Sequence, residues 1–336
     1  MIMLTALCAL LLNLSVYPND RIPSWEECST NTHNLPNIQD IIGNYSRLFS
    51  NIAECMDKPH DDCEKGYVFY GPPGTGKSTI PLALTKALDG VCLKISGAIF
   101  ENKMQGSGPE MIQLLFDRAK EIAYQNQKVI IFIDEIDIIG VRNIKPEFNS
   151  EANKTLTQLL VEIDNLPKDL PITIIGATNF RKKLDFALTR EERLIAVATK
   201  LPNENERKNI LFHYANNYTN LKNSPEFMAE LNNYVKKTTN FTPASLKKFI
   251  VAAARHYNPT EPDKKLIEKI FQEIQKRHLE NMKCYKDKKE QEEVRYKLDK
   301  KLLEKMEFDE SFQGKAWNFT KFAASNAISF LLGKYT

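Results

Sequence analysis

Residues 71–79 combine glycine, proline, lysine and hydroxyl side chains in an order that is typical of a phosphate-binding loop. They follow an apolar stretch and match the pattern G-x-x-x-x-G-K-[ST], which lies between a strand and a helix. The glycines let backbone N–H groups point inward at a phosphate, and the helix N-terminus adds positive potential. The lysine can reach the β- and γ-phosphates of ATP, and the serine hydroxyl can ligate Mg²⁺. The predicted nucleotide-binding residues are Gly71, Pro72, Pro73, Gly74, Thr75, Gly76, Lys77, Ser78 and Thr79.

Two adjacent carboxylates, Asp134 and Glu135, form the second candidate group. They end a buried-type strand, and open α/β sheets bind ligands at the carboxyl ends of their strands. Asp134 would bind the nucleotide and hold Mg²⁺ through water, together with Ser78. Glu135 would polarise the attacking water as a general base. The two groups together predict a site that hydrolyses ATP with Mg²⁺ as its cofactor.

The sequence pattern predicts the strands and helices that would position these side chains. Apolar runs bounded by turn residues predict five strands, at 67–70, 91–95, 129–133, 172–175 and 194–198. Helical patterns alternate with them, which favours βαβ units and a parallel sheet. After residue 202 only helices are predicted, at 204–219, 224–237, 243–257 and 263–282. The predicted fold class is therefore α/β, a P-loop NTPase with a parallel five-stranded sheet flanked by helices, followed by a small all-α lid domain.

Composition, net charge and cysteine spacing restrict the class of protein, its partners and its location. Hydrophobic residues make up 42% of the 336 residues and charged residues 26%, which is typical of a soluble globular protein. The net charge of +3 is too small to predict a nucleic-acid or membrane surface. The cysteines, at positions 8, 28, 55, 63, 92 and 284, form no C-x-x-C pair. They predict reduced thiols in a reducing compartment, and hence a cytoplasmic location.

The two ends of the chain leave alternatives open. Residues 1–16 are apolar and uncharged, but as a helix they would span about 24 Å, less than the roughly 30 Å of a bilayer core. They are a short membrane anchor, a cleaved signal, or the result of a start assigned upstream of the true one. Residues 17–38 are expected to be a linker. Residues 283–336 predict a charged helical tail with an apolar helix at 317–332, which either folds back onto the body or faces a partner or membrane.

Four further motifs carry a resemblance to a known family. Lys65-Gly66, IFIDEID at 131–137, LVEID at 160–164 and IIGATN at 174–179 occur in the order found in the AAA branch of the AAA+ ATPases. This branch includes katanin-type severing enzymes, membrane-anchored AAA proteases and endosomal-sorting ATPases. The resemblance covers residues 40 to 282 and implies an ATPase domain at 39–201 and a helical lid domain at 202–282.

The resemblance also implies roles for single residues. Ile42 and Gly43 match the segment whose backbone cradles the adenine, and Asn179 matches the first sensor, which helps to place the attacking water. Arg190 and Arg193 match two arginines that face the nucleotide of the neighbouring subunit. The Pro-Gly that is usual between these arginines is Glu191-Glu192 here. The predicted catalytic residues are Glu135, Asn179, Arg190 and Arg193.

Two segments depart from the family pattern. The pore loop is expected within 95–108, where Met104 stands in place of an aromatic residue. This methionine either grips a substrate chain or packs the loop. The third lid helix opens with FTPAS at 241–245 in place of a Gly-Ala-Asp pattern, which leaves Lys248 as the candidate for a second sensor or as a solvated lysine.

The resemblance implies a ring, expected to be a homo-hexamer, that couples ATP hydrolysis to the remodelling or unfolding of a protein substrate. One alternative is a loader or remodeller acting on nucleic acid, but no nucleic-acid partner is expected at this charge. Another is a nucleotide-dependent scaffold that hydrolyses slowly. None of the five histidines lies in an H-E-x-x-H motif, so no zinc protease activity is expected of this chain.

Overall fold

The computed structural model describes residues 26–28, 45–60, 62–100, 107–139, 150–190, 193–260 and 262–310. The predictions for Ile42, Gly43, Met104 and the apolar segments at 1–16 and 317–332 lie outside these residues. Within the described ranges, no helix combines the length and the apolar character that crossing a membrane requires.

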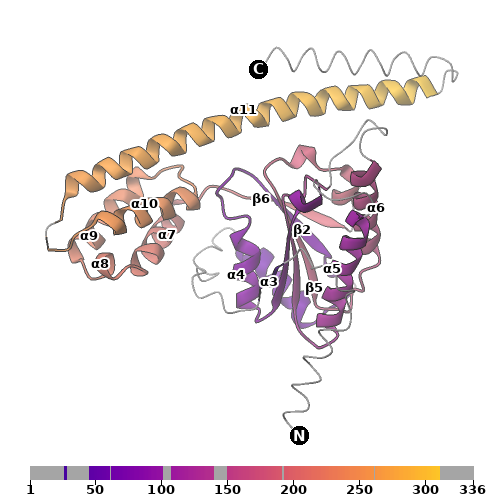
Figure 1. Cartoon of the computed structure of the whole chain (residues 1–336), viewed down its shortest axis with the longest axis horizontal. Coiled ribbons are helices and arrows are strands. Elements are labelled where there is room, and N and C mark those ends of the chain that lie inside the picture. The colour runs from indigo at the N-terminus through magenta and orange to yellow at the C-terminus, as the bar shows by residue number, and fades with distance from the viewer. Residues whose placement is uncertain are drawn as a thin grey trace, which may run out of the picture.

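Six strands form one sheet in the order β1-β3-β4-β5-β2-β6 (Figure 1). The five predicted strands are all present and parallel, as expected. A further strand, β1, lies in the stretch predicted as a linker and pairs with β3 in the antiparallel direction. The strands are β1 (Glu26–Cys28), β2 (Gly66–Tyr70), β3 (Val91–Ser96), β4 (Val129–Asp134), β5 (Ile172–Thr178) and β6 (Leu194–Ala198).

Helices cover both faces of this sheet (Figure 1). One face carries α3 (Ser46–Asp57) and α4 (Thr79–Ala87), and the other carries α5 (Ser107–Ala123) and α6 (Ser150–Asp164). Successive residues of a strand point to opposite faces, so Ile130 and Phe132 of β4 pack on the α3 and α4 side, and Ile131 packs on the other. Burial on both faces explains why the strands are continuous apolar runs without polar alternation.

The lid domain is helical, as predicted, and has a hydrophobic core of its own that includes Leu211, Phe249 and Phe271. Each of its main helices begins at a residue that caps it. Asn203 and Glu206 form a capping box at the first helix, and Thr242 caps the helix that starts at Pro243. The lid helices are α7 (Glu204–Asn216), α8 (Thr219–Lys222), α9 (Pro225–Lys237), α10 (Pro243–His256) and the first part of α11 (Lys264–Glu310).

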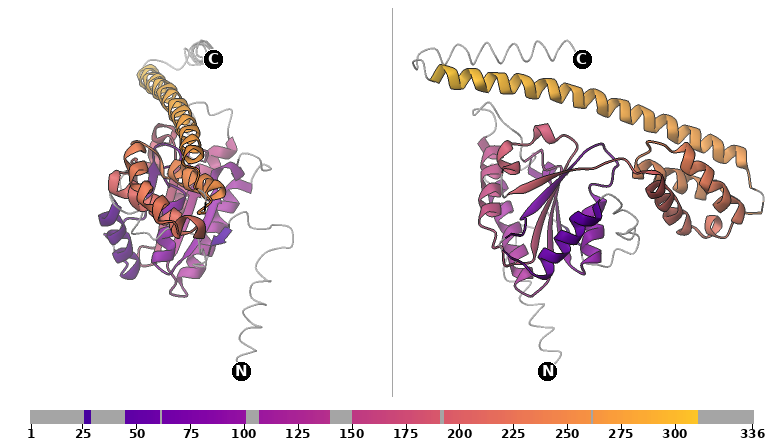
Figure 2. Two further views of the ribbon diagram at one scale, coloured as in Figure 1. Left: turned by 90° about the vertical axis from the view of Figure 1, so that its left-hand side faces the viewer. Right: turned by 180° about the vertical axis from the view of Figure 1, so that it is seen from behind.

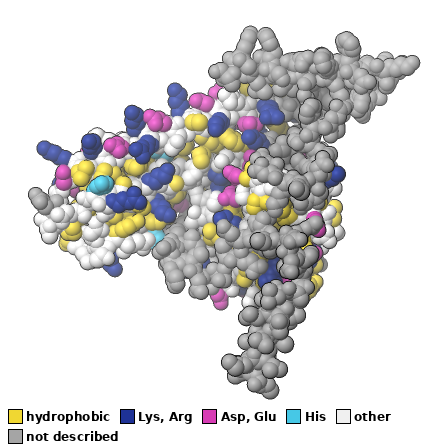
Figure 3. Space-filling view, in the orientation of Figure 1, with side chains coloured by type: hydrophobic (Ala, Val, Ile, Leu, Met, Phe, Trp, Pro, Cys, Tyr) yellow, Lys and Arg dark blue, Asp and Glu magenta, His cyan; other side chains and the backbone are white. Residues whose placement is uncertain are grey.

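Helix α11 is one continuous helix of 47 residues, which is about 70 Å long at 1.5 Å per residue. The predicted boundary between lid and tail at residue 282 falls inside it. The helix leaves the lid and runs over the α/β domain, as two opposite views show (Figures 1 and 2). Basic and acidic side chains are interleaved along the edge of the molecule where it lies (Figure 3). Neither glycine nor proline interrupts residues 264–310, so these two common causes of a sharp kink are absent from the helix.

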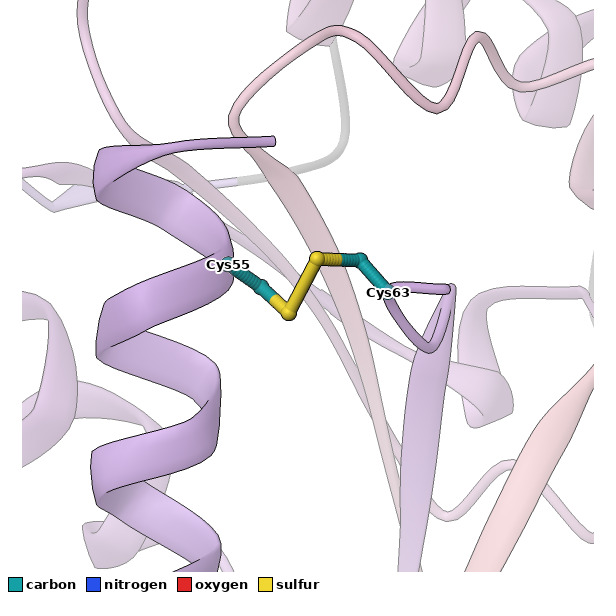
Figure 4. The surroundings of a disulfide bond; sticks show 2 residues. All are labelled: Cys55 and Cys63. Atoms are coloured by element: carbon teal, nitrogen blue, oxygen red, sulfur yellow. A yellow bond between two sulfur atoms is a disulfide. The ribbon is translucent and has the colours of Figure 1, made fainter. Parts of the chain in front are cut away.

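The prediction that all cysteines are reduced thiols is wrong for one pair, because Cys55 and Cys63 form a disulfide (Figure 4). Cys55 lies near the end of α3, and a turn closed by a hydrogen bond from Cys63 N to His60 O returns the chain towards β2. This turn brings the two Cα atoms to 5.7 Å, which the sequence spacing alone did not reveal. Cys92, which is buried, and Cys284, which is exposed, are not disulfide-bonded.

The same turn gathers the one group of metal-type donors found among the described residues. The ligand atoms of Cys55, His60 and Cys63 lie within 4.8 Å of one another. Because the two sulfur atoms are bonded to each other, the group offers a single donor, the imidazole of His60, and we assign no metal to it.

Candidate nucleotide site

The predicted phosphate-binding loop lies between the end of β2 and the start of α4. Gly74 and Gly76 have positive φ angles of 77° and 94°, a conformation that side chains disfavour. Gly74 is also sterically restricted, since a Cβ there would lie 3.0 Å from the Cβ of Ala244 in the lid. The glycines therefore allow the turn that brings backbone N–H groups and the N-terminus of α4 to one point.

Lys77 is held inside this loop and is only 8% exposed. Its Nζ donates hydrogen bonds to the backbone oxygens of Gly71, at 3.0 Å, and Pro72, at 2.8 Å. Burial lowers the pKa of Lys77 to about 8, although the charges of Asp134 and Asp137 act in the opposite direction. The ammonium group is thus desolvated and lies within electrostatic reach of two carboxylates, which makes it a favourable partner for a phosphate anion.

In the acidic pair, Asp134 is the last residue of β4 and Glu135 follows it in a turn of left-handed backbone conformation. Glu135 has a φ of 53°, and its N–H donates to Oδ1 of Asp134 at 3.1 Å. The turn requires glycine at position 97, where a Cβ would lie 2.3 Å from the Glu135 carbonyl oxygen. Glu135 is exposed and Asp134 is half-buried. A non-glycine residue in this conformation is uncommon and is found often at functional sites.

Asp137 belongs to the same region, and we did not predict it as a site residue. Burial raises its pKa, which the Thr178 hydroxyl partly offsets through a hydrogen bond and Lys183 through its charge. Its charge also acts on Lys77. The motif IFIDEID contains this second aspartate, so the repeated acidic residue was the feature that could have identified it.

The sheet order brings the predicted polar groups to one edge. β4, β5 and β2 are neighbours, so their carboxyl ends lie side by side. Asp134 ends β4, Asn179 directly follows β5, and the loop with Lys77 follows β2. Tyr70 at the end of β2 is level with Thr178, the residue before Asn179. The arrangement places Lys77, the acidic pair and Asn179 on the same side of the sheet.

The two predicted arginines have different environments in the chain. Arg193 forms a bidentate ion pair with Asp164 and donates from Nη1 to the Ala187 oxygen at 2.7 Å. Arg190 is exposed and lies 6.0 Å from the centre of the Phe186 ring, a side chain that is itself 65% exposed. Arg193 is therefore bound within its own chain, whereas Arg190 is at the surface.

The lid contacts the phosphate-binding loop at the start of α10. The N–H of Ala244 donates to the Gly74 oxygen at 3.1 Å. Lys248, the candidate for a second sensor, is exposed one turn further along the helix. On the other side of the loop, the hydroxyls of Thr75 and Thr199 are hydrogen-bonded at 2.8 Å. The loop is thus fixed by both the end of β6 and the lid.

Comparison with known proteins agrees with this geometry. A family model described as "ATPase family associated with various cellular activities (AAA)" matches residues 67–199. These residues include the loop, the acidic pair, Asn179 and both arginines.

Curated relatives match over a longer stretch. The chain is 36% identical over 200 residues to "ATP-dependent zinc metalloprotease FtsH 2" of Thermoanaerobacter sp. (strain X514), covering 59% of this chain and 37% of the relative. It is 35% identical over 184 residues to "Proteasome-activating nucleotidase" of Methanopyrus kandleri, covering 51% and 41%. It is 34% identical over 192 residues to mouse "ATP-dependent zinc metalloprotease YME1L1", covering 56% and 26%. The chain therefore spans less than half the length of each of these relatives.

Proposed function

Because residues 67–199 belong to the AAA family of ATPases, we propose that this chain binds ATP and Mg²⁺ and hydrolyses the nucleotide. The observation that carries the proposal is the environment of Lys77. This lysine is buried, and its Nζ donates hydrogen bonds to two backbone oxygens of its own loop. Burial lowers its pKa, and the negative charges of Asp134 and Asp137 also act on it, in the direction that raises the pKa. A desolvated cation beside acidic oxygens fits a triphosphate together with a divalent metal ion.

Each residue has a proposed role. Lys77 and the loop amides bind the phosphates, and the hydroxyl of Ser78 and the carboxylate of Asp134 hold Mg²⁺, which neutralises phosphate charge when bound. Glu135 accepts a proton from the attacking water, and Asn179 orients that water. The residues that are proposed to contact the adenine, Ile42 and Gly43, complete the site.

The relatives support a proposal for the substrate class. The names of two of them describe proteases, and the name of a third describes an activator of the proteasome. We infer that this chain remodels or unfolds proteins and assembles as a homo-hexameric ring. The exposed Arg190 and Phe186 support the ring, because a neighbouring subunit could bury both. A cytoplasmic location stays part of the proposal because ATP is available there, although the Cys55–Cys63 disulfide removes the argument from reduced thiols. A membrane tether through residues 1–16 stays one of the three alternatives for that segment.

A slowly hydrolysing scaffold is the second candidate. The observation that favours it is the ion pair of Arg193, which occupies one of the two arginines within its own chain. A ring with a single arginine per subunit boundary would stabilise less of the charge that develops on the phosphates.

One experiment separates the candidates. Phosphate release by the full chain is measured with Mg²⁺, and again after addition of an unfolded polypeptide or of single-stranded DNA. A protein-remodelling motor hydrolyses ATP and is stimulated by the polypeptide, and stimulation by DNA alone would identify a nucleic-acid remodeller. Slow release that neither addition changes would identify the scaffold. Absence of hydrolysis with a protein that binds ATP would contradict the enzymatic proposal.

A further inference from the structure

The middle of α11 contacts the segment that carries the proposed sensor position. The ring of Tyr285 stacks on Phe180, with centroids 5.6 Å apart and planes inclined by 20°. Its hydroxyl donates a long hydrogen bond of 3.4 Å to the backbone oxygen of Asn179. One side chain of α11 therefore contacts both residues that follow β5.

Two ion pairs extend this contact into the next turn of the segment, η3 (Arg181–Lys183). Lys182 Nζ lies 3.3 Å from Glu293, and Lys183 Nζ lies 3.2 Å from Glu292. Lys182 also lies 5.5 Å from the centre of the Tyr296 ring. Each partly exposed pair contributes little alone, but together with the stacked rings they fix the segment against the helix at several points.

The contacting side chains lie on one face of α11. His278, Tyr285, Glu292 and Tyr296 follow one another at intervals of four or seven residues, the spacing of a single helical stripe. All four are buried or half-buried, whereas residues 286–291 between them are exposed. The stripe begins in the lid, where His278 is 5% exposed and packs on Phe241 at 4.7 Å.

The lid end of this stripe leads back to the phosphate-binding loop. Nδ1 of His278 lies 3.1 Å from the hydroxyl of Ser245, in the first turn of α10. The neighbouring Ala244 donates its N–H to Gly74 in the loop. From Gly74 the contacts thus run through α10 to α11, and along α11 to Asn179. The two sides of the nucleotide site are thus joined through the lid by one continuous helix.

We propose that Tyr285 is a positioning residue for ATP hydrolysis, through which α11 ties the orientation of the lid to the placement of Asn179. This inference rests on the proposed role of Asn179 as the group that orients water. Movement of the lid, which contacts the phosphate-binding loop at Gly74, is transmitted to the backbone of Asn179 and Phe180. Hydrolysis is then fastest when α11 is docked, and a partner that lifts α11 from the α/β domain slows it.

The test compares two variants of the full chain. Tyr285→Phe keeps the stacked ring and removes the hydroxyl, whereas Tyr285→Ala removes both. We expect Tyr285→Ala to lower kcat about tenfold with KM for ATP changed by less than about twofold, because phosphate binding is separate from the sensor. Tyr285→Phe should stay within about threefold of the wild-type kcat, since most of the contact survives. Hydrogen exchange of the amides of Phe180 to Lys183 should be faster in Tyr285→Ala.

Glu293→Lys tests the same contact without a change in the ring. It breaks the ion pair with Lys182, and we expect a two- to threefold loss of kcat, about what an exposed pair can supply. Its matched control is Asp287→Lys, the same charge reversal at an exposed position on the opposite face of α11, which should leave kcat unchanged. The double variant Lys182→Glu with Glu293→Lys restores opposite charges and should recover the loss.

The outcomes separate this inference from its premise. If Asn179→Ala is slow but Tyr285→Ala and Glu293→Lys have wild-type kcat, the link through α11 is wrong and the sensor role stands. If Asn179→Ala itself keeps the wild-type kcat, the sensor role is wrong and the inference falls with it. A third outcome would overturn the proposal and leave Tyr285 with only a structural role. In that outcome Tyr285→Ala lowers the melting temperature and alters kcat and KM together, while Glu293→Lys and Asp287→Lys have the same kcat.

Discussion

Arg193 donates two hydrogen bonds to the Asp164 carboxylate, from Nε to Oδ1 at 2.8 Å and from Nη2 to Oδ2 at 2.6 Å. The Arg193 N–H also donates to the Arg190 oxygen at 3.2 Å, so the ion pair anchors the turn that presents Arg190. The two arginines therefore have different environments in the single chain. Arg193 is bound within its own chain, and we propose that the exposed Arg190 is the side chain that contacts a neighbouring subunit.

The first prediction concerns Arg190. Arg190→Ala should lower kcat on the order of 10³-fold if the side chain neutralises phosphoryl charge across a subunit boundary, with no change in melting temperature. Mixed with Lys77→Ala protein, it should recover part of the activity, because each variant then supplies what the other lacks. Failure to recover in mixed rings, with assembly verified by sedimentation, would contradict a role in trans.

Arg193→Ala should act on stability. Loss of a half-exposed bidentate pair costs about 1 kcal/mol, which corresponds to a fall of roughly 2–4 °C in melting temperature for a domain of this size. The hydrogen bond from Arg193 lowers the pKa of Asp164 below the ordinary value of 3.8 for an aspartate. The pair therefore stabilises the fold above that value, and the stabilisation is lost as the pH falls through the lowered pKa. The difference between wild type and Arg193→Ala should shrink in the same range, and a constant difference down to pH 2 would show that the ion pair is not its cause.

Glu135→Gln should separate binding from turnover. The amide keeps the size of the side chain but cannot accept the proton, so kcat should fall about 10²-fold or more. Affinity for ATP, measured by titration of a fluorescent analogue, should stay near the wild-type value. Lys77→Ala is the comparison, since it should lose affinity. Near wild-type hydrolysis by Glu135→Gln would remove this residue from the role of general base.

Met104 lies outside the described residues, and its role stays a prediction. If it grips a substrate chain, Met104→Ala should keep basal ATP hydrolysis within about twofold and lose stimulation by an unfolded polypeptide. Met104→Phe should keep that stimulation, because it retains a large apolar surface. If Met104 packs the loop instead, Met104→Ala should cost about 2–5 kcal/mol and lower the melting temperature and both rates together.

Reduction of the disulfide should destabilise the α/β domain without affecting the lid. Cys55 and Cys63 close a loop with a sequence separation of 8, for which loss of the crosslink costs about 2–3 kcal/mol on the chain-entropy model. The melting temperature with and without a dithiol reductant measures this cost. The double variant Cys55→Ser with Cys63→Ser is the control. It should have the melting temperature of the wild-type protein whose disulfide is reduced, and the reductant should not change that temperature.

The sequence predicted the features that depend on local pattern. The strands are long apolar runs with turn residues at both ends, and the phosphate-binding loop has a fixed spacing, so both could be located. β1 could not, because three residues are too few to show alternation. The pairing of Arg193 with Asp164 joins positions 29 residues apart, and the contact of Tyr285 with Asn179 joins positions 106 apart. Such contacts depend on tertiary packing, for which a single sequence has no periodic pattern.

The sheet order has a consequence for how the chain folds during synthesis. β2, which leads into the phosphate-binding loop, lies between β5 and β6, the last two strands to be made. Its first residue, Gly66, is level with Ile174 on one side and with Leu194 on the other. A nascent chain that has left the ribosome only as far as Arg190 therefore has one side of β2 unpaired, with its N–H and C=O groups open to other strands. The loop can reach its native form only after Leu194–Ala198 emerge, so β2 is open to misassembly for more than a hundred residues of synthesis.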